Sequence, residues 1–407
     1  MPNETVEQFA ARARSWLAEQ VQVSGGSTAA GQDPAGVDLA EQKRFQAALY
    51  DAGFVGITWP VEVGGQGLPE QYQQAWNDVV KDFDTPTGAF IIGIGMCGPT
   101  VADLGSDELK QRYLKPLLRG EEIWCQLFSE PGAGSDVASL QTRAVLDGGE
   151  WVVNGQKVWT SVAASANFGA LLARTDPTKP KHGGITMFVV DMHDPGVTVR
   201  PLVDMSGGAR FNEVFFDDVR ISADAVIGEV DAGWAAAVTM LGHERVFIGG
   251  RVGPRSSPLD FDSLARVARE KDRADDPAVR DALAEVYLRQ QSLRLLNALM
   301  REQADSGHPP GARGSISKLV GAQAAAFAAD VAAEIAGPSA IAWEGDDTEA
   351  TELARYVNSA PASAIAGGTS QIQRNIIGER VLGLPKETQV DRNIPFNQLK
   401  IGTQGSV

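Results

Sequence analysis

The chain has 407 residues, a formal net charge of −16 at pH 7 and a hydrophobic content of 43%. This length and apolar content suffice to bury a large core, and they indicate two or three domains. Because no basic block offsets the acidic balance, the composition argues against binding to nucleic acid or to an anionic membrane surface.

The cysteines and the N-terminus bear on the cellular compartment. Cys97 and Cys125 both lie in apolar sequence surroundings. We therefore expect neither a disulfide framework nor a bound metal such as structural zinc. The first residues, Met1 to Thr5, are polar and acidic and do not resemble a signal peptide. No apolar run approaches the roughly 18 residues that a membrane span requires. These features predict a cytoplasmic protein.

The first predicted domain, residues 1–121, is helical throughout. Gly- and Pro-rich breaks separate its apolar-periodic stretches. Ser106 before Asp107 and Glu108 is typical of a helix start, because the hydroxyl can cap a free N–H group and acids favour that end. The periodicity predicts helices over 4–22, 39–53, 68–83, 87–104 and 106–119.

One stretch of this domain, residues 89–96, is apolar on all sides. It can be read as a helix buried in the core or as one wall of a lipid-like pocket. The sequence leaves both interpretations open.

The second predicted domain, residues 122–230, is rich in β-strands. Turns such as the one at Asp147-Gly148-Gly149 separate short runs of strand-forming residues, which indicates an antiparallel barrel or sandwich. Asn154-Gly155 between alternating apolar runs predicts a tight hairpin turn. Strands are expected over 151–160, 168–174, 185–191, 197–203 and 212–220.

The third predicted domain, residues 231–390, returns to helices and reads as a four-helix bundle. The charged stretch from Arg266 to Asp276 should lie at a helix boundary or on a solvated face, and Thr369 or Ser370 can cap the last helix. The tail, residues 391–407, is expected to be extended or frayed. Helices are predicted over 232–251, 277–306, 313–336, 347–359 and 369–383.

Two segments of the β-rich domain carry the clearest functional signal. They read Ser-Glu-Pro-Gly-Ala-Gly-Ser-Asp over 129–136 and Asn-Gly-Gln-Lys-Val-Trp-Thr-Ser over 154–161. Together they resemble the flavin-binding signature of the acyl-CoA dehydrogenase family. The order helical, β-rich, helical also resembles that family's architecture, and the resemblance covers nearly the whole chain. It implies an oxidoreductase of lipid metabolism with FAD as cofactor.

The resemblance also implies roles for individual residues. Ser129 would offer a hydroxyl to the flavin ring, Trp159 would cover one face of the ring, and Ser161 would bind near N5. The residues expected to bind the cofactor are Gln126, Phe128, Ser129, Gly134, Ser135, Trp159, Thr160, Ser161, Thr369 and Gln371. Those expected to bind the substrate are Ser135, Leu241, Arg245, Gly367 and Gly368.

The catalytic base is the point at which the chain departs from many family members. They carry a Glu where this chain has Gly367. A smaller set carries the base earlier, in a Glu-Arg pair that aligns with Glu244 and Arg245. We therefore expect Glu244 to be the base. Glu344 is a rival acid on an expected loop, and no catalytic role is expected for His243.

The expected activity is FAD-dependent α,β-desaturation of an acyl-CoA thioester to a trans-2-enoyl-CoA, with hydride passing to flavin N5, as in fatty acid β-oxidation. An electron-transfer flavoprotein would take the electrons. The alternatives are a flavin oxidase or monooxygenase of the same fold, and a non-catalytic partner subunit of a heteromeric acyl-CoA dehydrogenase.

The expected assembly is a homodimer or homotetramer, or a heteromer with a related chain. Two segments differ from the family's usual cross-subunit flavin contacts, namely 269–279 and 334–338. In this the chain resembles the branch that includes steroid-side-chain and unusual-acyl dehydrogenases, some of which pair two different subunits.

Overall fold

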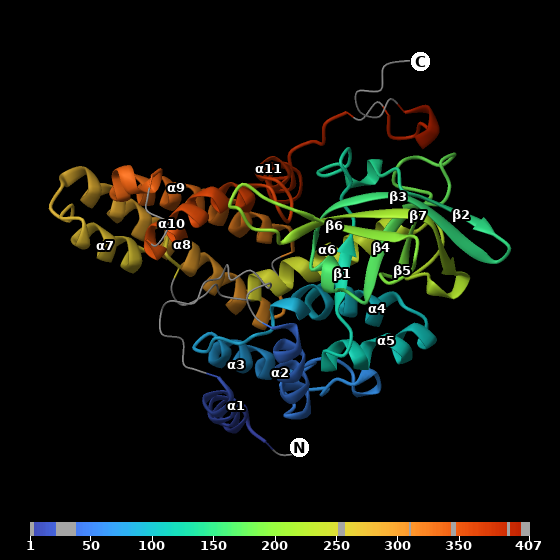
Figure 1. Ribbon diagram of the computed structural model, residues 1–407, viewed down its shortest axis with the longest axis horizontal. Helices are drawn as coiled ribbons and strands as arrows, with labels where there is room; N and C mark the ends of the chain where they lie inside the picture. Colours follow the sequence, from blue (N-terminus) through green and yellow to red (C-terminus); the bar gives the residue numbers. More distant parts are fainter. Residues whose placement is uncertain are drawn as a thin grey trace. The chain divides into compact units, whose positions relative to one another are not determined.

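The computed structural model describes residues 4–21, 38–250, 257–308, 311–342, 347–388 and 391–399, without the side chains of 245–250, 304, 305 and 349. The chain divides into two compact units (Figure 1). One unit comprises Met1–Asp204, Ala209–Val252 and Gln389–Val407, and the other comprises Met205–Gly208 and Gly253–Thr388.

The N-terminal part of the first unit is helical, as predicted. Thr5 and Gln8 form a capping box at the first helix, and the Ser106 hydroxyl accepts a hydrogen bond from the Leu109 N–H. Phe9, Phe54 and Trp76 pack together at the centre of these helices. The α-helices are α1 (Val6–Gln20), α2 (Leu39–Asp51), α3 (Glu70–Val80), α4 (Gly98–Leu104) and α5 (Asp107–Arg119).

The apolar stretch at 89–96 is not one regular helix. It passes through the short 3₁₀ turn η3 (Gly88–Phe90) and the π-helical turn η4 (Gly93–Cys97) before α4 begins. Phe90, Met96 and Cys97 are buried in the core, which confirms the core interpretation. Single π-helical turns are frequent at functional sites, so the pocket-wall interpretation stays a prediction.

A seven-stranded sheet follows, in the order β1-β4-β2-β3-β7-β6 with β5 paired to β4. Most neighbours are antiparallel, as expected, but β1 runs parallel to β4, so the sheet is mixed. A parallel pair needs a long crossover rather than a tight turn, and here the crossover includes the glycine-rich segment 129–136. The strands are β1 (Trp124–Leu127), β2 (Arg143–Asp147), β3 (Glu150–Ser161), β4 (Phe168–Arg174), β5 (Ile185–Asp191), β6 (Val197–Leu202) and β7 (Phe211–Ser222).

The expected hairpin turn at Asn154-Gly155 is wrong. Both residues lie inside β3, where the pairing with β7 shifts register, and the turn between β2 and β3 is at Gly148-Gly149. Gly155 has φ 154°, and a Cβ there would lie 2.5 Å from Thr142 Oγ1. The Asn-Gly pair therefore serves a bulge and a close backbone approach.

The helices after the sheet begin with α6 (Gly233–Gly250), which belongs to the first unit. In the second unit, Thr369 caps α11, as predicted, and the chain continues as a π-helical turn at Ile377–Val381. Helix α7 was not predicted, although the charged stretch 266–276 does span its end. The second unit contains α7 (Phe261–Glu270), α8 (Pro277–Asp305), α9 (Gly314–Ala336), α10 (Thr348–Ser359) and α11 (Ser370–Ile376).

Helix α9 is the central helix of the second unit's core. Its alanine-rich face is buried, with Ala328, Ala332 and Ile335 packed among side chains of α7, α8 and α10. Within the described residues, Gly311–Ala340 is the one helical stretch long and apolar enough to cross a membrane, judged by length and hydropathy. The expectation that no segment reaches this limit does not hold for it. The central helix of a packed bundle passes the same test.

The described part of the tail is not frayed, contrary to expectation. Residues Phe396–Gln398 form a 3₁₀ turn, and the Phe396 side chain is only 7% exposed. The tail belongs to the first unit, where it packs beside the sheet (Figure 1).

Candidate active site

A buried ion pair joins the two motifs that the sequence singled out. Lys157 on β3 is fully buried, and its Nζ lies 2.8 Å from Glu130 Oε1 and 3.1 Å from the Phe128 carbonyl oxygen. The Glu130 carboxylate also accepts hydrogen bonds from the N–H groups of Gln141 and Thr142, at 2.7 and 2.9 Å. The pair thus ties the segment after β1 to the strand that carries Trp159.

The surroundings of Glu130 favour its charged form. Burial alone would raise its pKa, but the Lys157 ammonium and the hydrogen bonds to the carboxylate outweigh burial and lower the pKa below its ordinary value. A lowered carboxyl pKa adds stability that is present above the unfolded-state pKa of about 4.3 and lost as the pH falls through the folded-state value. The contribution is therefore complete at neutral pH.

The glycine-rich turn that follows Glu130 is held open to solvent. Glu130 and Ala133 exchange backbone hydrogen bonds of 3.0 Å, while Gly132, Gly134 and Ser135 are exposed. A Cβ added at Gly132 or Gly134 would meet no atom of the described residues within 4 Å. The fold itself does not require these glycines, so they suit the close approach of a bound molecule.

Trp159 is presented outward by a strained backbone. It has φ 61°, in the left-handed region, and sits where the pairing of β3 with β7 shifts register between Lys157 and Thr160. The indole is 56% exposed and packs edge-on against Phe211, with 5.7 Å between ring centroids. Left-handed conformations of bulky residues are costly and are concentrated at functional sites. The bulge therefore aims an aromatic face away from the core.

Other residues expected to bind the cofactor lie on the same two segments. Thr160 is 2% exposed, and its hydroxyl has no hydrogen-bond partner among the described residues. Phe128 is buried, and Ser129 accepts a backbone hydrogen bond of 2.9 Å from Val158. Ser161, which ends β3, is half-buried. The structure brings the two motifs together, and the roles of the individual residues stay predictions.

The remaining expected residues lie in the second unit. Thr369 is the N-cap of α11, and Gln371 is exposed. Gly367 and Gly368 both have positive φ, and their carbonyl oxygens accept hydrogen bonds from Gln373 Nε2.

Gln373 is a candidate functional residue that was not predicted from the sequence. Its side chain is buried, and Oε1 has no hydrogen-bond partner in the described part of the chain. Its place four residues after the capping Thr369, one helical turn on, is the signal that could have found it.

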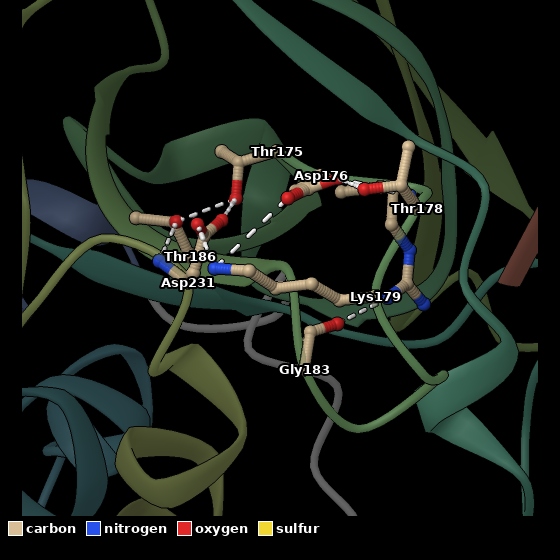
Figure 2. Close-up of polar contacts among 8 residues, drawn as sticks. Thr175, Asp176, Thr178, Lys179, Gly183, Thr186 and Asp231 are labelled. Carbon is tan, nitrogen blue, oxygen red and sulfur yellow. Dashed lines mark hydrogen bonds and ion pairs between the residues drawn. The ribbon is translucent and has the colours of Figure 1, made fainter. Parts of the chain in front are cut away.

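Helix α6, which carries Glu244, starts from a polar cluster at Asp231. This residue has φ 66°, and its carboxylate accepts hydrogen bonds from Thr175 Oγ1 at 2.5 Å and Lys179 Nζ at 2.6 Å. Its N–H donates to Thr186 Oγ1 at 2.8 Å, and Figure 2 shows these side chains converging on Asp231. A Cβ at Gly233 would lie 2.7 Å from the Thr186 backbone, so α6 begins directly against β5.

Glu244 continues the buried face of α6. Ala237 and Met240 are buried, and Glu244 follows them by seven and four residues, which places it on the same side of the helix. Met240 Sδ lies 3.6 Å from Nε2 of Gln126 on β1. The expected base is therefore one helical turn from a residue that contacts the expected flavin segment.

The other residues predicted near the base, and the rival acid Glu344, are placed as follows by the described residues. His243 Nε2 is 2.8 Å from Asp103 Oδ2 on α4, which agrees with a structural role. Leu241 is half-buried against the core around Met240. The side chain of Arg245 and all of Glu344 lie outside the described residues.

Comparison with known proteins identifies the family. Models of the N-terminal, middle and C-terminal domains of acyl-CoA dehydrogenase match residues 3–121, 125–219 and 231–382. The acyl-CoA dehydrogenase IpdE1 of Mycobacterium tuberculosis is 36% identical over 391 residues, which cover 94% of this chain and 99% of that protein. This chain belongs to the acyl-CoA dehydrogenase family.

Solved structures agree with this family. The Tcur3481–Tcur3483 steroid ACAD is 27% identical, with a TM-score of 0.80 over 95% of this chain and 99% of its own. The ChsE4–ChsE5 complex from Mycobacterium tuberculosis is also 27% identical, with a TM-score of 0.72 over 95% of this chain and 100% of its own.

As an acyl-CoA dehydrogenase, the protein is an FAD-dependent oxidoreductase. Three observations on the described part of the chain fit the cofactor. Trp159 is exposed on its bulge, the Thr160 hydroxyl has no partner there, and Gly132 and Gly134 have open space beside them there. We expect Trp159 to lie against the flavin ring, and the turn at 132–135 would offer N–H groups and a hydroxyl to the diphosphate.

Replacing Trp159 with Ala is expected to weaken FAD binding by about 2- to 10-fold, because an aromatic pair contributes about 0.5–1.5 kcal/mol beyond its buried area. The FAD dissociation constant can be measured by fluorescence during titration of the apoprotein with FAD. Val145→Ala, at a residue 57% exposed on β2, is the control and should bind FAD as wild type does. An unchanged dissociation constant for Trp159→Ala would contradict the placement.

Proposed function

We propose that this enzyme removes hydrogen from the Cα–Cβ bond of an acyl-CoA thioester to give a trans-2-enoyl-CoA, with Glu244 as the base. The main support is the place of Glu244 on α6, one turn after the Met240 that contacts Gln126. At the position where many family members carry the base, Gly367 has no side chain that could accept a proton.

In this proposal, one group of residues transfers the proton and another holds the helix that carries the base. The Glu244 carboxylate takes the proton from Cα, and its place one turn after the buried Met240 sets it on the buried side of α6. The cluster at Asp231 fixes the start of the helix that carries it. FAD, when bound, supplies the acceptor for the hydride from Cβ. An electron-transfer flavoprotein then takes the electrons.

The proposed substrate class is a steroid-derived acyl-CoA. The support comes from the structural neighbour named a steroid ACAD, which matches almost the full length of both chains. ChsE4–ChsE5 is named a complex, and the name of the steroid ACAD likewise joins two protein names. We accordingly propose that this chain assembles with a related acyl-CoA dehydrogenase chain or with a second copy of itself.

Glu244→Gln should slow anaerobic flavin bleaching by an acyl-CoA substrate by at least about 10²- to 10⁴-fold, because the amide cannot accept the proton. Stopped-flow absorbance measures this step directly. FAD content and thioester binding should be retained, since the amide has nearly the same shape.

The controls for this experiment are His243→Gln, which changes the preceding residue, and Glu344→Gln, which removes the rival acid. Both should bleach at close to the wild-type rate. Fast bleaching by Glu244→Gln together with slow bleaching by Glu344→Gln would contradict the assignment of the base.

A panel of CoA esters tests the substrate class. The wild-type enzyme should reduce an artificial acceptor faster with steroid-side-chain thioesters than with straight-chain ones of similar length. Equal or faster turnover of straight-chain esters would contradict the steroid proposal.

Steady oxygen consumption during turnover would favour the oxidase alternative. A single chain purified without flavin that acquires it only with a related chain would support the partner-subunit alternative.

A further inference from the structure

The C-terminal tail is bound to the loop between β4 and β5, residues 175–184. Pro395 pairs with Pro180 in an isolated antiparallel bridge. The N–H of Phe396 donates to the Lys179 carbonyl at 2.8 Å, and the N–H of Asn397 donates to the Pro177 carbonyl at 2.9 Å. These bonds fix the tail along one side of the loop.

Phe396 covers a buried arginine. The Arg174 guanidinium carbon lies 3.8 Å from the centroid of the Phe396 ring, and Arg174 is only 4% exposed. The same guanidinium donates to the carbonyls of Lys181, Gly183 and Ala138, at 2.9, 2.8 and 2.6 Å. Arg174 therefore joins the β4–β5 loop to Ala138, which follows the glycine-rich turn.

The loop makes further contacts with the candidate site. Lys181 Nζ lies 3.0 Å from Asp136 Oδ2, at the end of the glycine-rich turn. Lys179 binds Asp231 just before α6. The His182 ring packs edge-on against Trp234 in the first turn of α6, with 4.8 Å between centroids. One loop thus touches the flavin segment and the start of the helix that carries Glu244.

We propose that residues 391–399 act as a clasp that holds the β4–β5 loop, and through it the glycine-rich turn and the start of α6, in the geometry that binds FAD. Phe396 is the central positioning residue, because its ring is stacked on the guanidinium that bridges the loop to Ala138. The clasp rests on the proposed placement of FAD at the glycine-rich turn.

The arrangement explains why an aromatic residue occupies this point of the tail. The two terminal nitrogens of the Arg174 guanidinium donate to carbonyls, while its Nε has no partner among the described residues. A buried cation of this kind still needs a favourable surface over its face, and an aromatic ring supplies one. An aliphatic side chain fills the same space without that attraction. The tail contacts also bring a segment from the chain end, over 200 residues later, onto the loop next to the cofactor segment.

The test uses the full-length holoprotein and four variants. Phe396→Ala and deletion of 389–407 should each weaken FAD binding by about 2- to 30-fold, the range expected for residues that act on a site through a chain of contacts. Both should also speed amide hydrogen exchange in 131–138 and 176–184. Phe396→Tyr keeps the ring face and should restore wild-type values. Phe396→Leu keeps the apolar volume and should resemble Phe396→Ala.

Two controls separate the clasp from general destabilisation. Phe215 is another ring beside an arginine, with 4.9 Å between its centroid and the guanidinium carbon of Arg200 on β6. Phe215→Ala should leave FAD binding unchanged. Deletion of 400–407 alone should also bind FAD as wild type does.

Unchanged FAD affinity and exchange in Phe396→Ala would overturn the clasp, as would wild-type behaviour of Phe396→Leu. A wild-type protein that binds no FAD would instead overturn the proposed function. The exchange measurements on 131–138 and 176–184 would still decide whether the tail holds the loop.

Discussion

The candidate site depends on the buried ion pair between Lys157 and Glu130. A lysine with no exposed surface is tolerated only when its charge is balanced, and here a carboxylate and a carbonyl oxygen do so. The pair is not needed to make a sheet. It ties the segment that follows β1 to strand β3 in one register. The glycine-rich turn and the Trp159 bulge are thereby held in a fixed position relative to each other. Because replacing a buried ion pair by well-packed apolar residues is often neutral in stability, we infer that this pair serves to fix one arrangement of the two segments.

A second constraint acts on the helix that carries the proposed base. Asp231 adopts a left-handed conformation that three polar partners stabilise, and Gly233 leaves no space between α6 and β5. The β4–β5 loop supplies two of these partners, Thr175 and Lys179, and also contacts Asp136 and the tail. The glycine-rich turn, the start of α6 and the tail therefore all contact the β4–β5 loop. A substitution in the tail can affect the candidate active site through this short series of contacts.

What could be predicted from the sequence is local, and what could not depends on distant partners. The flavin motif is a short pattern identified by its resemblance to a family signature, and the cap at Thr369 is a short pattern with its own physical signal. Asn154-Gly155 carried a turn signal as well, but positive φ serves a bulge equally well, and only the approach of Thr142 decides between them. The docking of Phe396 could not be predicted, because its partner Arg174 lies more than 200 residues earlier. The burial of Lys157 could not be predicted from hydropathy, because a lysine is buried only where a partner such as Glu130 balances its charge.

The most direct test is a double-mutant cycle on Glu130→Gln and Lys157→Met, with the FAD dissociation constant and the free energy of unfolding measured for all four proteins. Each single variant leaves a buried polar or charged group without its partner and should lose about 3–5 kcal/mol of stability as well as FAD affinity. The double variant should lose less than the sum in both quantities. If the two changes are coupled in stability but strictly additive in FAD binding, the ion pair does not organise the cofactor segment.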